Sequence, residues 1–314
     1  MFDKAIFMDV IPITISAADG RDLSAHYFVN AAGIKPRAWV IINSAAGVRQ
    51  TFYADFARYL AQNNYAVLTW DARGIGASAQ QSVRHDQARM RDWGQQDLQA
   101  VLLYCAEYFS GGLSKLHVIG HSAGGNLAGL APALMHVGSL CLIASGCCYW
   151  RMYPRRYWLR MLTSWHVLLP MMTKVFGYLP ARLGVGHDLP KQVAHEWRDW
   201  SLMPNYLFDD TTINSTCYSR YQGPLLALSI DDDHAFAPKA AVDALVGQFS
   251  AAQVERLHIT PAQYHLHQIG HFAYFKSANA VLWPLATKWL GDQTQNSASN
   301  VPTSSLSSLN FSLL

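Results

Sequence analysis

The chain has 314 residues, of which 51% are hydrophobic and only 14% are charged, so it is long and apolar enough to bury a sizeable core. Its formal net charge of +3 is too small to indicate a nucleic-acid-binding protein, and we expect no nucleic-acid partner. Five cysteines, an odd number that includes the adjacent Cys147 and Cys148, do not form the pattern of a disulfide framework. Reduced thiols in a cytoplasmic protein explain them more simply.

The sequence shows no targeting or membrane-spanning pattern. The first nine residues lack the basic start and the long apolar stretch of a secretory signal peptide. The nearest candidate for a membrane span, residues 161–179, is interrupted by His166, Pro170 and Lys174. We therefore expect a cytoplasmic protein without a membrane span, and the composition leaves its oligomeric state open.

Short apolar runs and segments of helical spacing alternate along most of the chain. Two alternating runs flank Asp19-Gly20 and predict a β-hairpin over residues 11–29. Apolar runs predict buried strands at residues 38–42, 66–70, 116–119, 139–144 and 224–230, and the more polar residues 254–259 are a candidate for the last strand. Helices are predicted near residues 52–63, 90–109 and 278–290. This alternation predicts an α/β fold with a mostly parallel central sheet and helices on both faces.

The alternation stops at residues 147–222. This stretch is rich in tryptophan, proline and methionine and is too apolar for a disordered linker. We interpret it as a helical cap inserted into a core domain made of residues 1–146 and 223–291. Residues 292–314 are rich in serine and asparagine and are expected to form a disordered tail.

The chemistry centres on Gly120-His121-Ser122-Ala123-Gly124, which follows a predicted strand and precedes a small, apolar stretch expected to start a helix. This context is typical of a nucleophile elbow, a strained turn that lifts the serine hydroxyl clear of the sheet. The start of the following helix then stabilises developing negative charge. Ser122 is therefore the candidate nucleophile, and the alternative is a tight turn without chemistry.

With this motif the chain resembles the α/β-hydrolases, in particular a group of uncharacterised serine-type members. The resemblance extends from the first hairpin to Leu290 and includes residues 43–48, 71–78, 90–94, 178–180 and 269–272. It implies the α/β-hydrolase fold with an inserted cap, no metal or organic cofactor, and a triad in the chain order serine, acid, histidine. It does not define the substrate, because members of this superfamily hydrolyse many ester-like bonds.

The resemblance places the acid after a late strand, within residues 231–233. A G-x-x-D turn aligns best with Asp232, but Ser229 stands where glycine is usual, and this departure leaves Asp233 as an alternative. The alternative interpretation is that these acids form a solvated turn without a catalytic role. His271, in a loop before the terminal helix, is the expected base that takes the serine proton and returns it to the leaving group.

An oxyanion hole needs two backbone amides near the nucleophile. One is expected from Ala123, directly after Ser122. The other comes from the loop after the strand at residues 38–42, where Asn43-Ser44 replaces the family's frequent His-Gly. By this match the second donor is Ala45, with Ala46 as the alternative.

Two other patterns have less specific interpretations. His265, His267 and His271 have the spacing of metal ligands, but no second half of a metal site accompanies them, so none is expected. Residues 149–158 interleave arginines with aromatic side chains. This pattern fits an apolar acyl tunnel with a basic rim, and it equally fits ordinary helix packing with solvated arginines.

We predict a serine hydrolase that cleaves a small-molecule carboxylic ester or thioester through an acyl-enzyme, with Ser122, Asp232 and His271 as its triad. The nearest alternative is an acyltransferase with the same triad, because water and an alcohol compete for one acyl-enzyme. The alternative from another class is a non-catalytic protein that uses the cap to bind lipid or a partner. A complete triad in the correct order argues against it.

Overall fold

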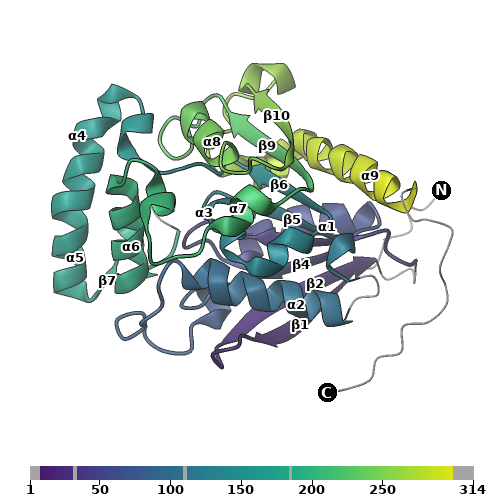
Figure 1. Ribbon diagram of the computed structural model, residues 1–314, viewed down its shortest axis with the longest axis horizontal. Coiled ribbons are helices and arrows are strands. Elements are labelled where there is room, and N and C mark those ends of the chain that lie inside the picture. Colours follow the sequence, from purple (N-terminus) through teal and green to yellow (C-terminus); the bar gives the residue numbers. More distant parts are fainter. Residues whose placement is uncertain (1–7, 31–33, 109–111, 184–185, 300–314) are drawn as a thin grey trace.

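The computed structural model describes residues 8–30, 34–108, 112–183 and 186–299, so most of the N-terminal segment lies outside it. An eight-stranded sheet crosses the molecule in the order β1-β2-β4-β3-β5-β6-β9-β10 (Figure 1). The predicted hairpin is present, with β1 antiparallel to β2; β2 also pairs antiparallel with β4, and every later pairing in this sheet is parallel. The strands of this sheet are β1 (Met8–Ser16), β2 (Asp22–Asn30), β3 (Trp39–Asn43), β4 (Ala66–Trp70), β5 (Leu116–His121), β6 (Ser139–Ile143), β9 (Pro224–Ile230) and β10 (Gln253–Ile259).

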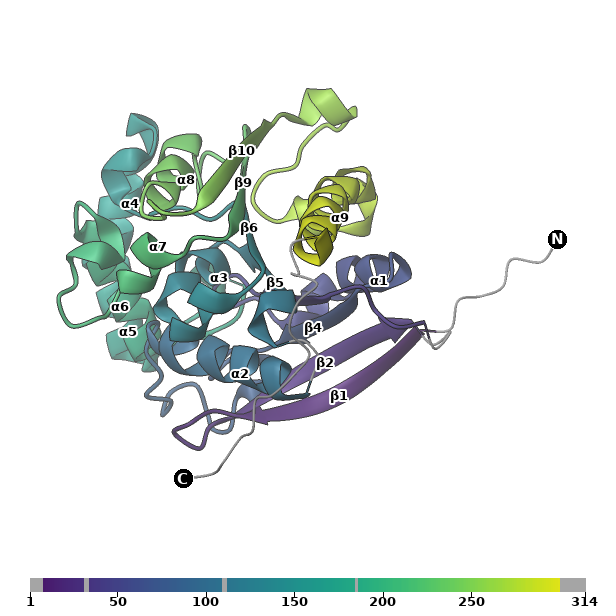
Figure 2. The same cartoon turned by 45° about the vertical axis from the view of Figure 1, so that its right-hand side comes forward.

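Helices cover both faces of the sheet, as Figure 2 shows. One face carries α1 (Ala54–Gln62) and α9 (Trp283–Ser299). The other carries α2 (Gln99–Tyr108), α3 (Ala123–Asn126) and α8 (Lys239–Val246). Every residue of β4, β5 and β6 is buried as a result, which is why these strands are mostly apolar in sequence. The predicted fold class is confirmed.

Residues 147–222, which we call the insertion, connect β6 to β9. The insertion contains α4 (Arg155–Thr163), α5 (Leu169–Phe176), α6 (Lys191–Leu202), α7 (Thr216–Arg220) and an antiparallel ribbon of β7 (Tyr178–Leu179) and β8 (Leu189–Pro190). The ribbon is a departure from the purely helical segment expected. Arg91 of the core pairs with Glu196 (2.5 Å) and Asp210 (2.9 Å) and so ties the insertion to the rest of the molecule.

Two helix predictions and the prediction of a disordered tail need correction. The helix after the elbow, α3, ends at Asn126 and gives way to two 3₁₀ turns, the second of which contains Pro132. The helix predicted over residues 90–109 begins as a π-helical segment, Trp93–Leu98. Residues 292–299 belong to α9 and not to a tail, because extending an existing helix costs far less than starting one. Residues 300–314 lie outside the described residues.

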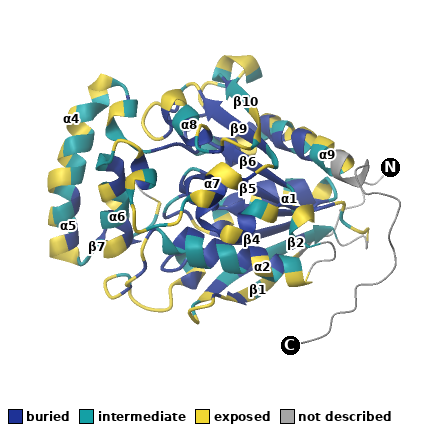
Figure 3. Ribbon diagram, in the orientation of Figure 1, coloured by how far each residue is buried: buried dark blue, intermediate teal, exposed yellow. Residues whose placement is uncertain are grey.

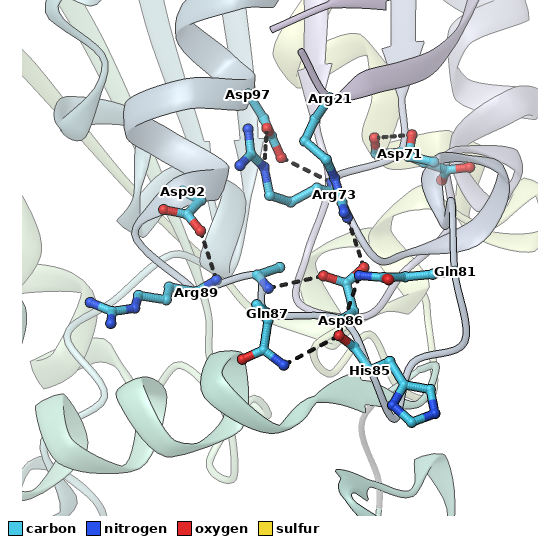
Figure 4. Close-up of polar contacts among 12 residues, drawn as sticks. Arg21, Asp71, Arg73, Gln81, His85, Asp86, Gln87, Arg89, Asp92 and Asp97 are labelled. Atoms are coloured by element: carbon cyan, nitrogen blue, oxygen red, sulfur yellow. Dashed lines mark hydrogen bonds and ion pairs between the residues drawn. The ribbon is translucent and has the colours of Figure 1, made fainter. Parts of the chain in front are cut away.

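A partly buried ionic network holds the loop after β4 (Figure 4). The Arg73 guanidinium contacts Asp97 (2.6 Å) and Asp19 (2.5 Å), and Arg21 pairs with Asp86 (2.7 Å). Burial raises the pKa of Asp97 to about 6 against the opposing effect of Arg73, so this carboxylate is still ionised at neutral pH. Loss of Arg73 or of Asp97 would leave the other buried charge unpaired. The pair therefore holds this loop in one conformation.

Candidate active site

Ser122 follows β5 at a strained turn. Its backbone has φ +52° and ψ −121°, a region that non-glycine residues rarely occupy and that is common at functional sites. The turn needs small neighbours. A Cβ on Gly120 would lie 2.5 Å from the Cα of Gly125, and one on Gly124 would collide with the Asn43 carbonyl. The expected elbow geometry is therefore present.

Ser122, His271 and Asp233 form a continuous line of hydrogen bonds. His271 Nε2 lies 2.8 Å from Ser122 Oγ, and His271 Nδ1 lies 2.6 Å from Asp233 Oδ2. Both His271 and Asp233 are buried. An ionised carboxylate only accepts hydrogen bonds, so Nδ1 carries the proton and Nε2 is left to accept the serine hydroxyl hydrogen. This is the arrangement that a general base requires.

The prediction that Asp232 contacts the imidazole is wrong. Asp232 instead accepts hydrogen bonds from the backbone N–H groups of Ile269 (2.9 Å) and Gly270 (2.8 Å). The turn after β9 closes with the Asp233 amide donating to Ile230 (3.1 Å), which brings the second of these two carboxylates against the ring. The spacing is thus one residue longer than in the G-x-x-D pattern. Asp232 holds the histidine loop, whereas Asp233 holds the imidazole.

The amide expected from Ala45 is already in use. Its N–H donates to the Tyr53 hydroxyl at 2.9 Å, so Ala45 is not a free donor for a substrate oxygen. Ala46 and Ala123 both line the pocket beside Ser122. Within the described part of the chain, the amides of Ala46 and Ala123 donate no hydrogen bond. These two amides, and not that of Ala45, are available to an oxyanion.

His121, which precedes Ser122, joins two loops of the site. Its Nε2 lies 2.8 Å from the His271 carbonyl, which can only accept, so Nε2 carries the hydrogen. Its Nδ1 lies 2.8 Å from the Tyr53 hydroxyl and therefore accepts from it. Burial lowers the pKa of His121 well below its usual range, and the nearby His271 adds to that shift, so the ring is neutral. Ala45, Tyr53, His121 and the His271 backbone thus form one chain of hydrogen bonds.

Sequence reasoning missed three of these contributors. Only the position of His121 inside the serine motif marked it, and nothing local marked Tyr53. Phe236 stacks on the His271 ring, with centroids 4.8 Å apart and planes 24° from parallel. Its carbonyl accepts a hydrogen bond from Tyr153 of the insertion at 2.7 Å. The insertion therefore contacts the loop after β9 that carries Asp233. In the sequence, the one local sign of this contact is an aromatic residue shortly after Asp233.

A pocket of about 320 Å³ opens beside Ser122 and His271. Its walls are mostly apolar. The insertion contributes Tyr153, Tyr157, Arg160, Met161, Trp165, Leu168, Leu169, Leu179 and Trp197. Among the described residues that line it, there is no aspartate or glutamate, and Arg160 is the one arginine or lysine. The arginines at positions 151, 155 and 156 lie outside this lining, over aromatic rings of the insertion.

The histidine cluster does not come together as a metal site. His265 and His267 are exposed, whereas both ring nitrogens of His271 are occupied by Ser122 and Asp233. In the described ranges, no three His, Cys, Asp or Glu side chains could hold a metal ion. The cysteines are free thiols. No helix within the same ranges is long and apolar enough to cross a membrane.

Comparison with known families gives the class of protein. Residues 34–267 match the Hydrolase_4 family, described as serine aminopeptidase, S33, and the chain belongs to this family of α/β-hydrolases. Over 125 residues it is 35% identical to a Caulobacter vibrioides protein named "Putative carbamate hydrolase RutD". That match covers only 40% of this chain and 40% of the relative.

Solved structures share the fold at low sequence identity. The structure of DcsB in complex with its substrate analogue has a TM-score of 0.62 at 13% identity and covers 91% of this chain and 100% of its own. Brefeldin A esterase, described as a bacterial homologue of human hormone-sensitive lipase, has a TM-score of 0.59 at 15% identity and covers 94% and 80%. These likenesses concern the architecture alone.

Proposed function

We propose that the protein is a serine hydrolase that cleaves a carboxylic ester or thioester of an apolar acyl group through an acyl-enzyme. The observation that carries this proposal is the hydrogen-bonded line from Asp233 through His271 to Ser122, which ends at an apolar pocket. Membership of a hydrolase family supports it.

In the proposed reaction, Ser122 Oγ attacks the acyl carbonyl while its proton passes to His271 Nε2. Asp233 holds the ring in the required tautomer and stabilises the imidazolium that forms. The amides of Ala46 and Ala123 donate to the oxyanion. His271 then protonates the leaving alcohol or thiol, and water attacks the acyl-enzyme by the same route. We assign no step to a metal or an organic cofactor.

The pocket favours an acyl substrate over a peptide with a free amino terminus. An α-ammonium group needs a carboxylate partner when it is taken out of water, and no Asp or Glu stands among the described lining residues. Arg160 instead suits a neutral or anionic group. The aromatic and aliphatic walls supplied by the insertion would bury the acyl chain, at about 0.8 kcal/mol for each methylene. The insertion is in this proposal the element that selects chain length.

A fluorophosphonate probe tests the nucleophile directly. Wild-type protein should be labelled and should hydrolyse aryl esters, with kcat/KM rising with acyl length until the pocket is full. Ser122→Ala should lose both labelling and turnover, whereas Ser219→Ala, a change on the exposed face of α7, should keep both. Equal labelling of wild type and Ser122→Ala would refute the proposal. Added acceptor alcohols in the same assay measure how much of the acyl group is transferred instead of hydrolysed.

A further inference from the structure

The insertion presents an apolar surface that faces away from the pocket. α4, the π-helical segment Ser164–Leu168 and α5 follow one another without a break and form one long rod, which stands at the outer edge of the molecule in Figure 1. Its outward side carries Leu159, Val167, Met171 and Val175, with exposed fractions of 79%, 57%, 47% and 63%. We call these four residues the outer stripe. Figure 3 shows the exposed positions that run along this rod.

Cations flank the outer stripe on the same rod. Arg155, Arg156 and Lys174 are exposed, and no aspartate or glutamate occurs anywhere between residues 149 and 187. Among the described residues none of these three side chains forms an ion pair, in contrast to Arg91, Arg198 and Arg256 elsewhere. Their charge is therefore available to a partner outside this chain.

We propose that the outer stripe and its flanking cations bind the surface of an anionic phospholipid membrane, with the rod lying in the plane of the interface. Exposed apolar side chains together with Lys and Arg are the two features that hold an amphipathic helix at such a surface. The apolar side chains enter the boundary between headgroups and acyl chains, and the cations contact anionic headgroups.

The charge pattern favours lipid over a second copy of the chain. A two-fold interface built on the outer stripe would bring the same arginine-rich surfaces of two rods together, and like charges that face each other oppose association. Exposed apolar residues elsewhere occur in ones and twos, such as Val254 on β10 and Leu103 with Tyr108 on α2, as is normal for a protein surface. The outer stripe differs because its members gather on one helix among unpaired cations.

The same rod also forms a wall of the pocket. Met161, Trp165 and Leu168 line the cavity from its inner side. Docking through the outer stripe would thus bring the pocket within one helix diameter, about 10 Å, of the lipid. An acyl ester could then enter from the membrane. This last consequence rests on the proposed function, but the docking surface itself does not.

Vesicle sedimentation of full-length Ser122→Ala protein tests the surface without interference from turnover. The protein should bind vesicles of mixed phosphatidylcholine and phosphatidylglycerol, should bind phosphatidylcholine alone far more weakly, and should be released by salt. Arg155→Gln/Arg156→Gln/Lys174→Gln should weaken binding to the anionic vesicles by about 100-fold, at roughly tenfold or somewhat less for each cation. Leu159→Ser/Val167→Ser/Val175→Ser should weaken it by at least about tenfold.

Matched variants control for general changes of charge and hydrophobicity. Lys35→Gln/Lys115→Gln/Lys288→Gln removes three exposed cations that form no ion pair among the described residues, and Leu103→Ser/Val254→Ser/Val281→Ser removes three exposed apolar groups; both should bind as Ser122→Ala alone does. Equal binding to the two vesicle types, or equal loss in test and control variants, would overturn the proposal. So would a dimer in light scattering that the outer-stripe variant abolishes without any vesicle binding. A wild-type protein that binds vesicles but resists the fluorophosphonate would refute the proposed function and leave the docking surface standing.

Discussion

The carboxyl edge of the sheet and the α4–α5 rod differ in the burial and pairing of their polar groups. At the sheet edge, Asp233, His271 and His121 are buried, and each has a hydrogen-bond partner. On the rod, the outer stripe and its cations face solvent without ion pairs among the described residues. Groups that must hold one geometry are enclosed and connected, whereas groups free to meet a partner are left exposed.

The contrast has an energetic meaning. A buried polar group without a partner costs about 1–3 kcal/mol, so changes at the sheet edge should propagate to stability and catalysis together. Surface substitutions usually stay within about 0.5 kcal/mol, so changes on the rod should leave the fold intact and alter only what it contacts. Four predictions test this division.

The largest effect should separate the adjacent carboxylates. Asp233→Asn should lower kcat by about 10⁴-fold, because an amide cannot hold His271 in the tautomer that accepts the serine proton. Asp232→Asn should cost far less, because it removes one of the two hydrogen bonds to the histidine loop and leaves the carboxylate that contacts the imidazole unchanged. Steady-state kinetics on one aryl ester measures both. A larger loss in Asp232→Asn would return the triad to the acid aligned by the sequence pattern.

Acidification should destabilise the core through His117. Burial lowers the pKa of this histidine to about 4, below the ordinary value of 6.5. Between pH 6.5 and 4 the unfolded chain therefore binds a proton that the folded chain does not, and stability falls as the pH falls. This pKa shift corresponds to a loss of about 3 kcal/mol in the free energy of unfolding by the time the pH has fallen to 4. Urea unfolding measures the free energy of unfolding of wild type and His117→Gln across this pH range. The two values should converge as the pH falls, and a constant difference between them would contradict the assignment.

Tyr53→Phe should affect stability and catalysis at once. It leaves the Ala45 amide and His121 Nδ1 without their partner, at a cost of about 1–3 kcal/mol in the free energy of unfolding. Because His121 also holds the His271 backbone, kcat should fall while KM changes little. Phe52→Leu, a change at the neighbouring partly buried ring that makes none of these hydrogen bonds, is the control for packing. A normal kcat in a destabilised Tyr53→Phe would limit this chain of hydrogen bonds to a structural role.

The smallest effect should come from the rod. Leu159→Ala should change the free energy of unfolding by less than about 0.5 kcal/mol, because this side chain is 79% exposed. Leu142→Ala, the same change at a fully buried position in β6, should cost about 2–5 kcal/mol. Chemical denaturation measures the pair. A large loss in Leu159→Ala would mean that the outer stripe packs against this chain and is no free surface.

Local pattern was enough to predict much of the molecule. The strands β4 and β9 begin and end where their mostly apolar runs do, since a strand covered on both faces buries nearly all of its side chains. Ser122 and His271 stood out because an elbow and a glycine-flanked loop leave a mark within a few residues. The helical end of α9 and the β7–β8 ribbon were missed, because short or polar segments take their form from what precedes and packs against them.

The choice among neighbouring groups was decided only by the tertiary structure. Asp232 and Asp233 are chemically identical and adjacent, and the histidine loop that separates their roles lies almost forty residues away. Ala45 and Ala46 are likewise indistinguishable until Tyr53 occupies one amide. Sequence by itself determined which residue types stand at the carboxyl edge of the sheet, because that depends on local backbone geometry. Which atom meets which partner depended on how loops distant in sequence pack together, and no local pattern carries that information.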